Sequence, residues 1–204
     1  MREIANTYSW VSLVERIDNG GKGAAVKAGM KAANDQGFTH ILQIDADDQH
    51  DTNDIPRILS LSETHPQAVI SGKPVYRNVP KIRYYGRYLT HIWVWINTLS
   101  LEIQDSMCGF RIYPLASSLG VVNSERVGNR MDFDTEILVR LHWQGVQVVQ
   151  FPTLVTYPAD GISHFRGLSD NILISWMHTR LFFGMLQRLP RLLTKKGSKR
   201  AEKQ

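Results

Sequence analysis

The sequence predicts an α/β fold in which a mainly parallel sheet carries helices on both faces. Between residues 10 and 71, short apolar runs typical of strands alternate with segments whose apolar residues recur every three or four positions, as in helices. One apolar run, within His40–His50, stops abruptly at a cluster of carboxylates, a pattern typical of a strand that ends at a ligand-binding crevice. The alternating order of strands and helices favours right-handed crossovers between parallel strands.

Turn residues separate the elements expected in the first part of the chain. Asn19, Gly20 and Gly21 form a turn, and the helix after it carries a stripe of alanine and glycine that allows close packing on a sheet. Gly37 ends that helix, and Pro66 follows the next one. The expected elements are the end of a helix at residues 1–9, a strand at Trp10–Ile17, a helix at Gly23–Asn34, a strand at Phe38–Ile44, a helix at Asp54–Thr64 and a strand at Gln67–Ser71.

The second part begins with an unusually aromatic helix, Lys81–Glu102. It fits either a core helix beneath the edge of the sheet or a helix at a membrane interface, where aromatic rings and cationic side chains suit the headgroup layer. Pro152 should end a strand, and Pro190 should end or kink the last helix. The other expected elements are a loop running into a strand at Asp105–Tyr113, a helix at Asp132–Trp143, a strand at Val146–Phe151 and a helix at Leu168–Leu189.

Length and composition favour one domain in a reducing compartment. A chain of 204 residues can bury a single core. The lone cysteine, Cys108, excludes an internal disulfide and a cysteine-built zinc site, which fits a cytoplasmic location. The first ten residues lack the apolar stretch of a signal peptide, and no apolar segment forms a clean membrane span. The net charge is +5, and residues 171–200 contain no acidic side chain, which points to an anionic membrane surface or nucleic acid as a partner.

The carboxylates after the apolar run are candidate metal ligands. Asp45 and Asp47 share one face of an extended backbone, and Gln49 falls on the same face. Their oxygens suit Mg²⁺ or Mn²⁺, which keep some water or phosphate oxygens among their ligands. The alternative is a solvated turn before a helix, and we expect residues 51–54 to cap that helix.

The glycine-rich stretch Asn19–Val26 is a weaker indication of phosphate binding. Its spacing does not match that of a phosphate-binding loop, and Ala24 stands where such loops have a hydroxyl side chain. A glycine turn before a helix still offers backbone amides and the ammonium group of Lys22 to an anion.

Four motifs taken together resemble family 2 glycosyltransferases. NGGKGAAVKAG, IDADDQH, DSMCGFR and FDTEILVRLHWQG occur in the order and at the spacing of that family. The likeness is greatest to the branch that transfers sugars from nucleotides to polyprenyl (dolichyl-type) phosphates, and it runs from about Ile17 to His164. The resemblance implies a GT-A fold, the Rossmann-like fold of nucleotide-diphospho-sugar transferases. It divides the chain into a GT-A domain at residues 1–166, an amphipathic helical segment at 167–194 and a basic tail at 195–204.

The same resemblance implies a role for each motif residue. Asp45, Asp47 and Gln49 hold the metal ion, Mg²⁺ or Mn²⁺, and Asp45 and Asp47 reach the donor diphosphate through it. The remaining roles are nucleotide-sugar binding by Lys22 and Gly23, catalysis by Asp105, Asp134 and Glu136, and binding of an anionic acceptor by Lys73, Arg77 and Arg111. The turn at residues 161–166 is similar to the one that closes the acceptor side. Acids such as Asp134 and Glu136 also stabilise a helix N-terminus without any catalytic role.

The sequence therefore predicts an inverting, metal-dependent transferase at the inner membrane surface. Its partners are expected to be a UDP- or GDP-sugar and a lipid-phosphate or glycan acceptor, without nucleic acid. The alternatives are a transferase acting on a saccharide hydroxyl and a non-catalytic fragment that binds membranes or nucleic acid through its basic tail. Two N-terminal strands of the family, which grip the nucleoside, have no counterpart before Asn19. We therefore expect weak or no transferase activity from this polypeptide alone.

Overall fold

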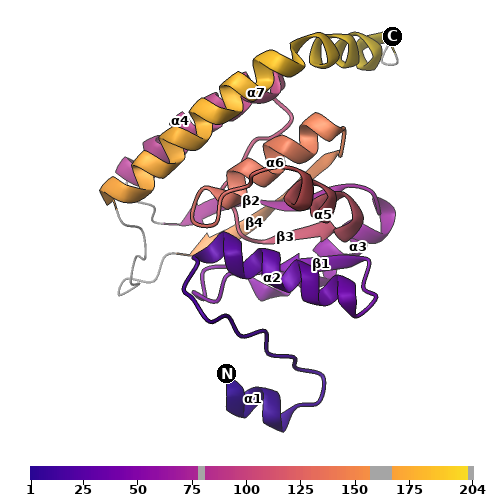
Figure 1. Ribbon diagram of the computed structural model, residues 1–204, viewed down its shortest axis with the longest axis vertical. Helices are drawn as coiled ribbons and strands as arrows, with labels where there is room; N and C mark the ends of the chain where they lie inside the picture. The colour runs from indigo at the N-terminus through magenta and orange to yellow at the C-terminus, as the bar shows by residue number, and fades with distance from the viewer. Residues whose placement is uncertain (78–80, 157–166, 202–204) are drawn as a thin grey trace.

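The computed structural model describes residues 1–77, 81–156 and 167–201, without the side chains of residues 77, 81–84, 167 and 195–201. Four strands and seven α-helices follow one another along the described chain (Figure 1). They are α1 (Arg2–Thr7), α2 (Lys22–Asp35), β1 (His40–Gln43), a short 3₁₀ turn at Thr52–Asp54, α3 (Ile55–Thr64), β2 (Val69–Arg77), α4 (Lys81–Thr98), β3 (Arg111–Pro114), α5 (Leu115–Ser124), α6 (Phe133–Gln144), β4 (Val148–Thr156) and α7 (Gly167–Ala201).

The sheet has the strand order β1-β3-β2-β4. β1 and β2 are both antiparallel to β3, and β2 is parallel to β4, so three of the four strands run in the same direction. The carboxyl ends of these three strands, together with the start of β3, therefore meet at one edge. In this register Arg111 of β3 lies between Gln43 of β1 and Ser71 of β2.

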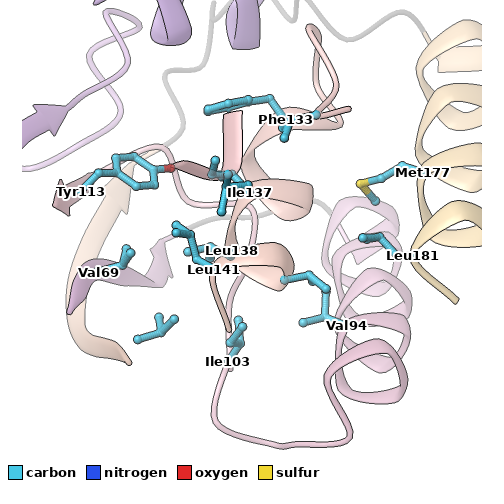
Figure 2. Close-up of a cluster of buried hydrophobic side chains, with 14 of the residues drawn as sticks. Val69, Val94, Ile103, Tyr113, Phe133, Ile137, Leu138, Leu141, Met177 and Leu181 are labelled. Carbon is cyan, nitrogen blue, oxygen red and sulfur yellow. The ribbon is translucent and has the colours of Figure 1, made fainter. Parts of the chain in front are cut away.

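Helices cover both faces of the sheet, as expected. Alternating side chains of each strand point to opposite faces, so Ile70 and Ile112 pack beneath α3 while Val69 and Tyr113 pack beneath α2, α5 and α6. Figure 2 shows the second of these clusters, with Ile137, Leu138 and Leu141 of α6 among its side chains. Cys108 is buried in the cluster beneath α3, and burial raises the pKa of its thiol to about 11.

The long helices α4 and α7 lie side by side and form a further layer outside α6 (Figure 1). Val94 of α4 and Met177 and Leu181 of α7 are fully buried between these helices and α6 (Figure 2). Outward-facing apolar side chains also remain on both helices, namely Tyr85, Tyr88, Leu89, Ile92, Leu168, Ile172, Trp176, Phe183 and Leu186. Within the described ranges, no helix is both long enough and apolar enough to cross a bilayer.

The sequence was misleading at several elements. Trp10–Ile17 is not a strand, because no strand in the described part of the chain lies beside it to complete a hydrogen-bonded ladder. β4 continues through Pro152, which is tolerated because β4 is an edge strand and the proline needs no partner for a missing N–H. α7 likewise continues through Pro190 rather than ending there. Helix α5 was not predicted, since its apolar residues lack a clear helical period.

Candidate donor and acceptor site

The candidate site lies at the edge where β1, β2 and β4 end, and where α2 and α6 begin. Lys22, the first residue of α2, places its ammonium group between two carboxylates. Its Nζ is 2.7 Å from Asp45 Oδ2, just after β1, and 2.6 Å from Asp134 Oδ2, in the first turn of α6. Three predicted site residues from distant parts of the sequence are therefore brought together.

Close packing of the backbone makes this arrangement possible. A side chain at Gly23 would collide with Phe133, so the absence of one lets the first turns of α2 and α6 touch. The carboxylate of Asp45 lies against Gly109, in the space that a Cβ atom would fill. Glycine is thus required at both positions for the ion pairs of Lys22 to form. Burial alone would lower the pKa of Lys22, but Asp134 and Asp45 outweigh it and raise that pKa above its usual range.

Asp134 is held by further donors from the sheet. Gln43 Nε2 donates to its Oδ1 at 3.1 Å, and Arg111 Nη1 lies 3.9 Å from the same oxygen. The Arg111 side chain is fully buried and donates to the backbone oxygens of Asp134 and Ser106 and to the hydroxyl of Tyr113. This position differs from the acceptor contact that we expected of Arg111. The side chain instead ties the start of α6 to the loop before β3.

Asp105 occupies that loop and is bound to α4. Arg87 Nη2 lies 2.9 Å and His91 Nε2 3.3 Å from Asp105 Oδ2, and the amides of Met107 and Cys108 donate to Oδ1. Although burial would raise the pKa of Asp105, Arg87 and His91 hold it well below its usual range. Asp105 is therefore an ionised carboxylate whose oxygens are both occupied by donors.

Glu136 points away from this edge, toward α7. Its two oxygens accept hydrogen bonds from Gly128 N at 2.8 Å, Arg140 Nη2 at 2.7 Å and Arg180 Nη2 at 3.1 Å. Its side chain is fully buried, and burial raises its pKa to about 7 against the opposing effects of the Gly128 amide and Arg180. None of these partners belongs to the cluster of Lys22, so the structure does not bring Glu136 together with Asp134 at one site.

The loop after β1 presents the remaining candidate metal ligands. Asp47 is exposed, and its Oδ1 accepts a hydrogen bond from the amide of Gln49 at 3.2 Å. Asp48 has a positive φ of 57°, which turns the chain between them. The ring of His50 stacks on Phe110, and burial lowers its pKa while Asp45 and Asp47 oppose that shift.

The donor chemistry of this loop fits a magnesium or manganese ion. Asp45 and Asp47 supply hard carboxylate oxygens, and Gln49 supplies an amide oxygen. In the part of the chain that the structure describes, no group of three or more His, Cys, Asp and Glu side chains converges as a complete ligand set. Two carboxylates with open positions suit an ion that also binds water and diphosphate oxygens.

The structure describes the side chain of one of the two remaining predicted acceptor residues, Lys73, but not that of Arg77. Lys73 is exposed and donates from Nζ to Gln104 Oε1 at 2.6 Å, next to Asp105. The side chain of Arg77 and residues 157–166, which include the predicted acceptor-side turn, lie outside the described part of the chain, as do the side chains of the basic tail. These predictions remain untested.

Sequence reasoning missed the residues that hold the site acids in place. They are Gln43, Arg87, His91 and Gln150. Arg87 and His91 are four positions apart and so lie on one face of α4, a spacing that could have identified them as a pair. Nothing in the spacing indicates that this face meets Asp105.

The chain is similar in sequence to a known family and to an archaeal protein. A family model described as glycosyl transferase family 2 matches residues 1–117. An uncharacterized protein from Methanocaldococcus jannaschii is 28% identical over 161 residues, which cover 76% of this chain and 68% of that protein.

Two solved structures show what the chain is similar to in three dimensions. A mycobacterial protein has a TM-score of 0.52 at 12% identity over 90% of this chain and 55% of its own length. Glucosyl-3-phosphoglycerate synthase from Mycobacterium tuberculosis has a TM-score of 0.48 at 13% identity over 89% of this chain. This chain spans 55% and 58% of the two structures, a little over half of each.

Proposed function

The chain belongs to glycosyl transferase family 2 and has a GT-A fold, and we propose that it transfers a sugar from a nucleotide-sugar donor to a lipid-linked phosphate. The reaction is an in-line displacement that inverts the anomeric carbon. One phosphate oxygen of the acceptor forms the new bond to that carbon as the bond to the donor diphosphate breaks. The nucleoside diphosphate leaves with the electron pair.

The observation that carries this proposal is the state of the three predicted catalytic acids. Asp134 is paired with Lys22, and Asp105 is paired with Arg87 and His91. Glu136 is buried among arginines on the other side of α6. A carboxylate paired with cations, as Asp134 and Asp105 are, is a poor general base, and Glu136 faces away from the site. An acceptor phosphate is already an anion near neutral pH and needs positioning rather than deprotonation, so the arrangement favours a phosphate over a hydroxyl acceptor.

The donor diphosphate belongs at the loop after β1. Asp45 and Asp47 would hold a Mg²⁺ or Mn²⁺ ion there, with Gln49 as a further oxygen donor. Bound at that position, the ion supplies Lewis-acid stabilisation of the negative charge that develops on the leaving diphosphate. The first turn of α2 adds its backbone amides and the ammonium group of Lys22, because a helix N-terminus favours an anion.

The acceptor belongs on the Asp105 side of the site. Asp105 fixes the guanidinium group of Arg87 and the imidazole ring of His91, and the exposed ammonium group of Lys73 lies next to this loop. We keep Arg77, at the end of β2, as a proposed ligand of the acceptor phosphate. These groups would hold an anionic phosphate at the edge of α4.

The outer surface of α4 and α7 supports a membrane location for that acceptor. Arg87 and His91 face Asp105, whereas Tyr85, Tyr88 and Leu89 of the same helix are exposed. Trp176 and Phe183 of α7 are also more than half exposed. Large apolar side chains exposed together beside a phosphate site are suited to insertion among lipid headgroups. We propose peripheral contact with an anionic membrane through this surface.

The acceptor is tested by a matched pair of substrates. A panel of UDP- and GDP-sugars with Mn²⁺ is offered with a short polyprenyl phosphate or with the corresponding polyprenol, and product is followed by mass spectrometry. We expect product from the phosphate only, even where the rate is low, and less than about a tenfold loss of rate in Asp134→Asn relative to the unaltered chain because no base is required. Transfer to a hydroxyl, with a loss of roughly 100- to 10,000-fold in Asp134→Asn, would overturn the proposal.

Membrane contact is tested separately by flotation with anionic vesicles. Replacement of Tyr88 and Leu89 by serine should reduce the bound fraction, because both side chains leave the apolar surface of α4. Leu59→Ser is the matched control, since Leu59 is an exposed leucine on α3, far from that surface in the fold (Figure 1). Equal binding by all variants would remove the membrane part of the proposal.

A further inference from the structure

Lys22 occupies the position of a cation between two acids of the proposed donor site. We propose that its ammonium group is the resident counter-ion of that site, and that a divalent metal ion binds Asp45 by displacing it. The inference rests on the proposed function, because it takes Asp45 as a metal ligand. It adds a competition between the metal ion and Lys22 for Asp45.

The two carboxylates paired with Lys22 differ in burial and in the number of their other partners. Asp134 keeps 7% of its side-chain surface exposed and has Gln43 and Arg111 as additional partners. Asp45 keeps 28% of its side-chain surface exposed, and its carboxylate lies against Gly109. A metal ion approaching from the exposed side therefore meets Asp45 first. Lys22 can release Asp45 and still remain paired with Asp134.

Electrostatics require that release. The ammonium nitrogen lies 2.7 Å from Asp45 Oδ2. A divalent ion bound to the same carboxylate would stand within a few ångströms of a positive charge, and the repulsion at such a distance is large wherever water is partly excluded. Metal binding and the Lys22–Asp45 pair therefore exclude each other.

Displacement gives Lys22 a second use. Lys22 begins α2 and stays paired with buried Asp134, so its ammonium group withdraws from the metal ion but remains at the edge where the donor diphosphate is proposed to bind. The same charge that balances Asp45 before loading then balances the diphosphate after loading.

A purely structural role for Lys22 makes the opposite prediction. If the ion pair serves to fix Asp45 in a metal-binding position, its removal loosens Asp45 and leaves Mn²⁺ affinity equal or weaker. If Lys22 competes with the metal, its removal strengthens the affinity. Metal affinity measured without donor or acceptor therefore separates the two roles.

The experiment is calorimetric titration of the full chain with Mn²⁺ alone. Lys22→Met and Lys22→Gln should each bind Mn²⁺ about tenfold more tightly than the unaltered chain, since a positive charge next to the ligand is gone. Lys22→Gln also keeps a hydrogen-bonding group for Asp134, and so guards against a folding defect in the methionine variant. The matched control is Lys27→Met, which removes one charge from the same helix, where Lys27 Nζ donates to Val127 O at 2.8 Å. It should change the affinity by less than about twofold.

The outcomes distinguish this inference from the proposed function. Binding by the unaltered chain with no gain in either Lys22 variant overturns the competition and leaves the proposed metal site intact. Binding that appears only in the Lys22 variants supports the competition. Absence of Mn²⁺ binding in every variant overturns the competition and the metal site together.

Discussion

Asp134 and Glu136 stand two positions apart in α6 and serve opposite sides of the helix. Because successive helical residues are rotated by about 100°, positions separated by two differ by about 200° around the axis. Asp134 therefore faces the edge of the sheet, where Lys22 and Gln43 contact it, while Glu136 faces Arg180 of α7. The two acids of one motif belong to two separate ion clusters.

The difference shows that two acidic side chains of one motif take different roles in the structure. The cluster of Asp134 opens toward solvent through Asp45 and the exposed Asp47, so a charged ligand can join it. The cluster of Glu136 is closed, because Arg140 and Arg180 fill both oxygens and the side chain has no exposed surface. The open cluster leaves room for a charged ligand, whereas the closed cluster fastens α7 to the domain.

The largest expected effect separates the clusters by activity. Asp45→Asn should lower the rate of sugar transfer roughly 100- to 1,000-fold, because a lost metal ligand removes several kcal/mol of leaving-group stabilisation. Glu136→Gln should keep the rate within about threefold, since the closed cluster touches no reacting atom. Initial rates at saturating Mn²⁺ measure both, with Asp48→Asn as an exposed acidic control. Equal losses in Asp45→Asn and Glu136→Gln would break the comparison.

The next effect concerns Arg111, the buried arginine that contacts Asp134 of the open cluster. Arg111→Met should lower the free energy of unfolding by about 3 kcal/mol, because the buried carbonyls of Ser106 and Asp134 lose their donor. Urea denaturation followed by circular dichroism measures it. Arg126→Met, at an exposed position, should stay within about 0.5 kcal/mol of the unaltered chain. A similar value for the two arginines would mean that burial of Arg111 has no structural role.

The smallest effect is a pH dependence that belongs to the closed cluster. Burial raises the pKa of Glu136 to about 7 from an ordinary value of 4.5, so between these values the folded chain holds a proton that the unfolded chain has lost. The stability that this proton contributes is present below pH 4.5 and is lost as the pH rises through 7. Glu136→Gln lacks this dependence and should gain about 2 kcal/mol relative to the unaltered chain between pH 5 and pH 8.

That comparison also controls for His178. Burial lowers the pKa of His178 to about 4, which makes stability rise with pH from 4 to 6.5 in both proteins, so its effect cancels in the difference. Thermal melting across the pH range, with the two proteins side by side, gives the difference directly. A constant difference would contradict the assignment of a raised pKa to Glu136.

Much of the fold follows from the sequence, because local signals agree with the final structure. The helices from Lys22, Ile55, Lys81 and Phe133 begin and end close to their expected positions, and β1 precedes the carboxylates as predicted. The order and direction of the strands in the sheet could not be predicted from the sequence. Reversed β3 lies between β1 and β2, an arrangement that depends on contacts between distant residues rather than on local periodicity.

The sequence predicted several residues of the site but not the directions in which their side chains point. The motifs identified Lys22, Asp45 and Asp134, and the structure places these three together. Helical rotation decides that Glu136 leaves the group, and burial decides that Arg111 supports it from within. Such facts arise from packing, which a single sequence does not display.

The central claim is that Asp45 and Asp47 bind a divalent cation at the end of β1. Titration of the full chain with Mn²⁺, followed by electron paramagnetic resonance, tests it most directly. We predict one bound ion per chain and at least about a tenfold weaker affinity in Asp45→Asn and in Asp47→Asn, with Asp48→Asn within about twofold of the unaltered chain. Equal affinity in all four proteins would contradict the claim.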